Sequence, residues 1–499
     1  MAENGTQRLY RAPCPACGAP VVFQSAQATH AVCSYCRSVV VRSGDALTRV
    51  GEVAEVFDDH SPLQMGASGR IALDGREQAF TLIGRVQLEG EAGRWTEWTA
   101  LLPDGQLAVL SEDNGAYVFS RSTRFAQPIP HAGSLPVGED TVLDGVTWSV
   151  GASVRAHMVS AEGELPGGPS LSRPFQVVEL RNAAGEVLSI DYGEDPPQAW
   201  RGRSVRLDAL SMQGLKTESA HEDEGARLFS CPNCGSPVAV RLDSTKAVTC
   251  PQCHYVIDVT RGIAGELKHT RQLQRVQPTI ALGSLGQFDG VPWQVVGFQR
   301  RSGSEDGEGF HWDEYLLYNA VMGFQFLVDA SDGWSLVRPA TGAPAYKARS
   351  NNASYEGRNY QRDSSYTAYT DYVEGEFYWP VKTGDRSRNI DFLSPSTRGT
   401  GVLSREQTGN EVTWSAGMRI PASEVRQAFG LAALRSAGDP TPWTPEMTRV
   451  LIGMVIFVLL LIVVIMVIAN TSSGGSSSSG GGRVTGGSYG GYTSGGSHK

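Results

Sequence analysis

The sequence predicts a mainly β protein with two zinc ribbons, two duplicated antiparallel β-rich domains and one C-terminal transmembrane helix. Three features predict this class: a four-cysteine motif that occurs twice, many short apolar runs between turn residues, and one uncharged apolar run near the C-terminus. The expected units are zinc ribbon 1 at 1–45, β-rich domain 1 at 46–222, zinc ribbon 2 at 223–262, β-rich domain 2 at 263–438, a proline-rich juxtamembrane linker at 439–449, the transmembrane helix at 450–469 and a disordered Gly/Ser-rich tail at 470–499.

The two cysteine motifs share the spacing C-x2-C-x15-C-x2-C and use all eight cysteines of the chain. Two thiolate pairs on two tight turns make the tetrahedral ligand set of zinc, so we expect two zinc ions per chain. A site of four thiolates has no open coordination position, and its expected role is therefore structural. The predicted ligands are Cys14, Cys17, Cys33 and Cys36 in the first ribbon and Cys231, Cys234, Cys250 and Cys253 in the second.

Two other interpretations of the motifs are open. His30 and His254 lie close to the cysteines and are candidate ligands or hydrogen-bond donors, although four thiolates already saturate zinc and favour surface histidines here. Disulfides would also use eight cysteines. The flanking Pro and Gly residues fit metal-binding turns better, and the polar N-terminus carries no signal segment that would indicate an oxidising compartment.

The long segments after each ribbon have the pattern of antiparallel meanders. Apolar and β-branched runs such as 95–102 are separated by turn sequences, of which Asp74-Gly75 and Asn114-Gly115 are typical of hairpins. The same order of runs returns after the second ribbon at an offset near 217 residues, as Trp312–Leu317 repeats Trp95–Ala100. This near-constant offset indicates tandem duplication of one module.

Aromatic residues recur in the repeated strands. Trp95 and Trp98 lie three positions apart, as do Trp312 and Tyr315. Because side chains of a strand alternate between its two faces, the members of each pair fall on opposite faces. We expect at least one aromatic ring of each pair in the core and hold a ligand-binding groove as the alternative.

These strands and turns resemble the bacterial DUF4178 family. Its members carry an Asp-Gly strand opener, a Trp-acidic-Tyr/Trp-Leu strand, a Gly-Trp strand and a Gly-Glu-Leu-Pro bend, and the resemblance covers roughly residues 60–215 and 275–430. One departure is Ala116 in the first copy where the second has Trp334. The resemblance implies a β-rich fold. Family members tend to be encoded near small membrane proteins and phage-shock-type proteins, which implies an envelope-linked role without naming a reaction.

The second copy carries a stretch rich in Tyr, Ser and Asn, from Asn351 to Asp371, that we interpret as an addition absent from the first copy. So few aliphatic residues bury little apolar area, and we expect a mobile loop. Tyrosine is common in binding surfaces, which makes this segment the candidate partner-binding site. The candidate residues are Tyr355, Tyr360, Tyr366, Tyr369 and Tyr372.

The C-terminal region predicts a membrane anchor. Val450–Ala469 contains no charged residue, and a helix of that length is about 30 Å long, the thickness of a bilayer core. Thiolate zinc sites require a reducing compartment, so we expect the N-terminal modules in the cytoplasm and a single-pass protein of the bacterial inner membrane. Basic residues lie on both sides of the span, so the positive-inside rule alone does not predict its orientation.

Three classes of function remain. The first is a membrane-anchored cytosolic adaptor or scaffold, envelope-associated, that binds a protein partner through its β modules. The second is an enzyme with an unrecognised site in a β module, although we find no catalytic motif and predict no catalytic residue. The third is a membrane-tethered nucleic-acid-binding regulator, which a net charge of −9 makes unfavourable. The adaptor is the expected function.

Overall fold

The computed structural model describes residues 10–432. Gaps in this range lie at 44–45, 54–60, 74, 91–92, 114–115, 168–172, 217–226, 243–244, 261–262, 264–266, 273–274, 306, 320–321, 347–349 and 396–399. The predicted linker, transmembrane helix and tail, residues 439–499, lie outside the described residues. Within the described part, no helix has the length and apolar character needed to cross a bilayer.

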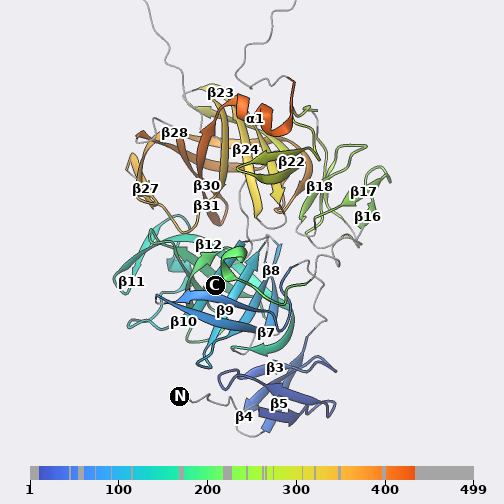
Figure 1. Ribbon diagram of the computed structural model, residues 1–499, viewed down its shortest axis with the longest axis vertical. Coiled ribbons are helices and arrows are strands. Elements are labelled where there is room, and N and C mark those ends of the chain that lie inside the picture. The colour runs from blue at the N-terminus through green and yellow to red at the C-terminus, as the bar shows by residue number, and fades with distance from the viewer. Residues whose placement is uncertain are drawn as a thin grey trace, which may run out of the picture.

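The first β-rich domain is a closed antiparallel barrel (Figure 1). Its elements are β6 Ser68–Leu73, β7 Arg76–Gly90, β8 Gly93–Leu101, β9 Leu107–Asp113, β10 Ala116–Thr123, η1 Ala132–Ser134, β11 Asp140–Leu143, β12 Val146–Leu165, β13 Phe175–Arg181, β14 Glu186–Asp191, β15 Gln198–Val205 and η2 Leu207–Leu210. The circuit runs β7–β8–β9–β10–β15–β14–β13–β12 and closes where β12 pairs with β7.

The second β-rich domain repeats this barrel, which confirms the predicted duplication. Its elements are β21 Leu285–Phe288, β22 Val291–Glu305, β23 Glu308–Asn319, β24 Gly323–Ala330, β25 Gly333–Pro339, β26 Ala345–Tyr346, β27 Asn352–Tyr355, β28 Arg358–Phe377, β29 Arg386–Ser394, β30 Gly401–Thr408, β31 Glu411–Ile420 and α1 Ala422–Phe429. The corresponding circuit, β22–β23–β24–β25–β31–β30–β29–β28, closes through the pair β28–β22.

Each barrel consists of two similar halves, which the sequence analysis missed. In the first barrel, β6–β10 and β11–β15 each comprise a short strand, a long strand and three more strands of one meander. The second barrel repeats this with β21–β25 and β27–β31. The turn between short and long strand has positive φ at both residues in Asp144-Gly145, Asp289-Gly290 and Glu356-Gly357, the type I′ geometry of tight hairpins.

The segment Asn351–Asp371 is neither an addition nor a loop, so this part of the prediction is wrong. It forms β27 and the first part of β28, whose lengths of 4 and 20 residues equal those of β11 and β12. The physical reason is a period-2 pattern: Ser364, Tyr366, Ala368 and Thr370 alternate with more exposed residues along the strand. Tyr and Thr are also favourable strand residues, and they pack well on a half-buried sheet.

Glycine pairs allow the two long strands of each barrel to cross closely. Gly84 pairs with Gly163 in the first barrel, and Gly297 pairs with Gly375 in the second. A Cβ atom at Gly84 would lie 1.8 Å from the carbonyl oxygen of Glu164, and one at Gly375 would lie 2.3 Å from that of Val296. Any side chain at these positions would separate the strands, so the crossing point requires glycine.

The repeated aromatic residues are all buried, whereas the core interpretation predicted at least one buried ring in each pair. Trp95 packs inside the first barrel with Leu88, whereas Trp98 packs on the opposite face of β8 with Leu63 and Phe80. In the second barrel, Trp312 and Tyr315 likewise belong to two different hydrophobic clusters. Apolar side chains therefore fill both faces of the barrel walls.

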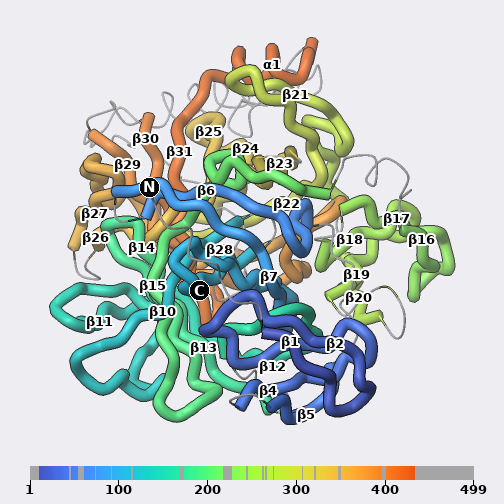
Figure 2. Tube along the Cα trace, turned by 60° about the horizontal axis from the view of Figure 1, so that its bottom comes forward, coloured from blue at the N-terminus to red at the C-terminus, as the bar shows by residue number. Residues whose placement is uncertain are grey.

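The ribbons extend the two barrels. The first ribbon, residues 10–53, contains β1 Tyr10–Pro13, β2 Pro20–Phe23, β3 His30–Val32, β4 Ser38–Ser43 and β5 Ala46–Glu52; the second, residues 227–270, contains β16 Arg227–Ser230, β17 Pro237–Val240, β18 Ala247–Thr249, β19 Val256–Asp258 and β20 His269–Thr270. The first ribbon lies at the lower end of the molecule in Figure 1, and the second lies at one side, as Figure 2 also shows.

The two barrels also contact each other directly. The amide of Ser153 in β12 donates to the carbonyl oxygen of Asn410 at 3.2 Å. The Nζ atom of Lys246, from the second ribbon, lies 4.0 Å from the carboxylate of Asp113 in β9, and both side chains are buried. The second ribbon thus contributes to the contact between the modules.

The interior of the second barrel carries a buried carboxyl group, Asp391 of β29. It accepts hydrogen bonds from Ser404 at 2.6 Å and Tyr366 at 2.7 Å. Burial raises the pKa of Asp391 to about 8, although these two hydroxyl groups lower it in part. The carboxyl group is therefore largely protonated near neutral pH in the folded protein.

We expect the melting temperature of Asp391→Asn to fall less between pH 6 and pH 9 than that of the wild type. Because the pKa is raised on folding, the folded state holds an extra proton between the unfolded pKa of 3.8 and the folded pKa of about 8, and stability falls as pH rises through this window. Thermal melting of the full chain in detergent at pH 6 and pH 9 measures this. The melting temperature of the wild type should fall further between these values than that of Asp391→Asn. Equal falls would contradict the assignment.

Candidate metal centres

Tight turns position the four cysteines of each ribbon. In the first ribbon the amide of Gly18 donates to the carbonyl oxygen of Cys14 at 2.8 Å, and in the second the amide of Gly235 donates to that of Cys231 at 2.9 Å. Gly18 and Gly235 have φ values of 78° and 74°, the left-handed conformation that glycine adopts without a steric cost. The Cys-Pro-x-Cys-Gly sequence therefore folds locally into the turn that directs two sulfurs to one point.

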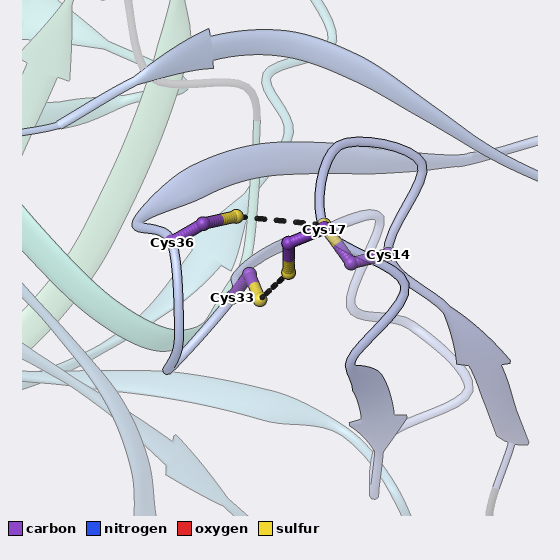
Figure 3. A group of neighbouring side chains, drawn as sticks. All are labelled: Cys14, Cys17, Cys33 and Cys36. Atoms are coloured by element: carbon purple, nitrogen blue, oxygen red, sulfur yellow. Dashed lines mark hydrogen bonds between the residues drawn. The ribbon is translucent and has the colours of Figure 1, made fainter.

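The structure brings both predicted four-cysteine groups together (Figure 3 shows the first). The sulfur atoms of Cys14 and Cys36 lie 3.7 Å apart, as do those of Cys17 and Cys33, and the equivalent distances in the second group are 3.6 Å for Cys231–Cys253 and 3.7 Å for Cys234–Cys250. All ligand atoms of a group lie within 4.8 Å of one another. Four sulfurs at a zinc–sulfur distance of about 2.3 Å are separated by about 3.8 Å in a tetrahedron. Both groups are thus compatible with zinc.

One thiol in each group has a pKa below the ordinary value for cysteine. The hydrogen bond between Cys36 and the Ser38 side chain lowers the pKa of Cys36 to about 6, and the hydrogen bond with Ser236 does the same for Cys234. Metals bind the thiolate, so a low pKa favours metal binding at neutral pH. The sequence contains a signal for this effect, since each of these serines follows its cysteine by two residues.

The alternatives to metal binding fit less well. The sulfurs are too far apart for a disulfide, whose S–S bond is about 2.05 Å, and all eight cysteines are free. Neither His30 nor His254 belongs to a potential metal group among the described residues. The Nδ1 atom of His30 is hydrogen bonded to the Thr29 hydroxyl at 2.8 Å, and His254 occupies a turn position with φ 58°.

Each ribbon is fastened to its barrel by one glutamate that the sequence analysis treated only as part of a bend. Glu164, at the end of β12, accepts hydrogen bonds from the backbone amides of Gln24 at 2.6 Å and Ser25 at 2.9 Å in the first ribbon. β3 also pairs with β12 at this point, where Ala31 lies opposite Glu164. Burial raises the pKa of Glu164, and the two amides oppose that shift.

The second module repeats the contact at the equivalent positions. Glu376, at the end of β28, accepts from the amides of Arg241 and Leu242 at 3.0 Å and from the Thr245 hydroxyl at 2.7 Å. β18 pairs with β28 where Val248 lies opposite Glu376. Because both modules use this device, we call Glu164 and Glu376 the clamp glutamates. The repeated Gly-Glu pair at 163–164 and 375–376 was the available signal.

The structure distributes the five candidate tyrosines over different environments. Tyr360, Tyr366 and Tyr372 are buried, and Tyr355 is partly buried with its hydroxyl accepting from the Thr341 amide at 3.0 Å. Only Tyr369, of these five, is largely exposed, at 42%. The five residues therefore do not form one surface.

The fold and the cysteine groups define a tandem protein of two modules, each a four-cysteine ribbon clamped to an antiparallel β barrel. The chain belongs to the DUF4178 family, a domain of unknown function, whose model matches residues 70–207 and 281–422 and so more than half of the 499 residues. The matched ranges correspond to the two barrels. No curated protein and no solved structure matches the chain.

We expect the purified full chain to contain two equivalents of zinc. Cys14→Ser should halve the metal content, because a three-thiolate set loses the closed tetrahedron, and Cys231→Ser should do the same independently. Elemental analysis measures the content. A folded chain free of zinc would contradict the prediction, and Ser34→Ala in the same ribbon is a control that should retain two equivalents.

Removing a clamp glutamate should detach its ribbon without removing the metal. Glu376→Ala leaves the amides of Arg241 and Leu242 without their carboxylate acceptor, and a hydrogen bond of this kind contributes about 1.5–3 kcal/mol. Limited proteolysis should then cut between the second ribbon and its barrel, while zinc content stays at two. The exposed Glu424 in α1 provides the matched control, Glu424→Ala. Equal protease resistance of both variants would contradict the clamp.

Proposed function

We propose that the chain is a membrane-anchored cytosolic scaffold whose barrels bind a protein partner and whose metal ions stabilise the ribbons. The observation that carries this proposal is the clamp: both ribbons use backbone amides that directly follow β2 or β17 to bind their own barrels. A ribbon that is bound to its own barrel in this way stabilises that barrel and does not act as a separate binding module. We therefore assign partner binding to the barrels.

The chemistry of the metal groups supports a structural role. Four cysteines saturate a zinc ion, so no coordination position remains for water or substrate. A catalytic zinc site keeps such a position open. The net charge of −9 is unfavourable for binding to the phosphate backbone of nucleic acids.

The outer face of the second barrel offers a surface for a partner. Tyr369 is exposed on β28 and lies opposite Ser302 of β22. Next to it, Arg300, His311 and Asp371 line a shallow groove across β22, β23 and β28. A tyrosine beside mixed charges is a frequent composition of protein-binding surfaces. Of the five candidate tyrosines, Tyr369 is therefore the one that we propose contacts the partner.

The membrane anchor in this proposal rests on the sequence. Val450–Ala469 is uncharged and long enough to span a bilayer as a helix. The thiolate groups favour the reducing cytoplasm for the ribbons and barrels. Such an anchor would hold the barrels near the inner surface of the membrane.

Site-specific crosslinking in cells tests the scaffold. A photoreactive benzoylphenylalanine at Tyr369 of the full chain should give one discrete crosslinked product in the membrane fraction, identified by mass spectrometry. The matched control is the same group at Val142, which is 64% exposed on β11 of the first barrel. We expect little product from that position. A discrete product from Val142 and none from Tyr369 would contradict the proposed surface.

A further inference from the structure

The first barrel contains a cavity that differs in chemistry from the interior of the second. The cavity has a volume of about 80 Å³, and residues of β7, β8, β9 and β12–β15 line it. Its apolar lining includes Leu88, Met158 and Phe175. Acidic side chains also line it, and none of its described lining residues is basic. The acidic residues are Glu97, Asp191 and Glu194.

The interior of the second barrel instead holds a guanidinium group of the chain itself. Arg301, only 3% exposed, donates to Glu406 at 2.8 Å and to Ser387 at 2.6 Å. Its guanidinium also lies 3.7 Å from Glu314 and 5.7 Å from the ring centre of Trp312. A buried cation between two carboxylates and an aromatic ring is stabilised by charge pairing and by the ring quadrupole.

The strand registers identify the residues of the first barrel that are equivalent to Arg301, Glu314 and Glu406 of the second. Leu88 lies opposite Trp95 as Arg301 lies opposite Trp312. Glu97 lies opposite Val86 as Glu314 lies opposite Gln299. On the other wall, Asp191 pairs with Gln198 as Glu406 pairs with Thr413. The first barrel therefore keeps the two carboxylates and has Leu88 at the position of Arg301.

The carboxylates are held in comparable ways in the two barrels. Trp312 Nε1 donates to Glu314 at 2.5 Å, and Trp95 Nε1 points to Glu97 at 3.4 Å. Glu97 is 8% exposed, so its carboxyl group lines the cavity at a position where water is largely excluded. A cation that enters would be attracted more strongly there than at the protein surface.

We propose that the cavity of the first barrel binds a small organic cation, with a guanidinium or ammonium head and a short aliphatic body. The head lies between Glu97 and Asp191, in the place of the Arg301 guanidinium, and the body packs on Leu88, Phe175 and Met158. The second barrel provides this cation from its own chain and needs no ligand. This inference is independent of the proposed scaffold function.

Calorimetric titration of the full chain in detergent with n-butylguanidinium tests the proposal. This probe carries the guanidinium and the three side-chain carbons of Arg301 with one more carbon in the place of Cα, and n-butylurea is a neutral control of nearly the same shape. We expect saturable binding of n-butylguanidinium with one site per chain and at least tenfold weaker binding of n-butylurea. Equal affinities, or no binding of n-butylguanidinium at millimolar concentration, would overturn the proposal.

Two variants assign the binding to the cavity. Glu97→Gln removes one carboxylate and should lower the affinity for n-butylguanidinium at least tenfold. Leu88→Arg introduces the side chain of the second barrel and should abolish binding while raising the melting temperature. Binding that persists in both variants, with their circular dichroism unchanged, would place the cation elsewhere and contradict the site. The matched control Leu228→Arg, at an exposed position of the second ribbon, should bind as the wild type does.

Discussion

One contact determines how the parts of each module are joined: a carboxylate at the end of a long barrel strand accepts backbone amides from the ribbon. Glu164 and Glu376 make this contact at equivalent positions. A ribbon of this size buries too little apolar area to fold alone, so we expect it to depend on a metal ion at its four cysteines and on the barrel wall that β3 or β18 extends. The glycine pairs at the strand crossings permit the close approach that brings each glutamate to its ribbon.

Duplication at two levels explains the architecture. Two meander halves close one barrel, and two barrels with their ribbons form the chain. The equivalent halves keep the same backbone, while their interiors have diverged. In the second barrel the guanidinium of Arg301 lies between two buried carboxylates, whereas the first barrel has Leu88 at that position and a cavity. The two modules therefore share a backbone frame and differ in the side chains of their interiors.

The sequence predicted those features that depend on local spacing. Cysteine turns form within a few residues, and the alternation of Trp95 and Trp98 follows from strand geometry. The half-barrel repeat was missed because its halves share little beyond Gly at the turn and strand lengths that only pairing reveals. The prediction for the tyrosine-rich stretch was wrong because it relied on the polar composition and did not use the period-2 alternation of Tyr366, Ala368 and Thr370, which indicates a strand. The clamp glutamates make contacts over more than 130 residues of sequence, which no local pattern indicates.

Hydrogen exchange of the full chain, with metal present and after chelation, tests the clamp most directly. If each ribbon braces its barrel, chelation should remove protection from the ribbons and from the ends of β12 and β28 together. Strands distant from the ribbons, such as β30, should keep their protection. Full protection at the ends of both long strands in a metal-free chain with exchanged ribbons would show that ribbon and barrel are independent, and would contradict this account.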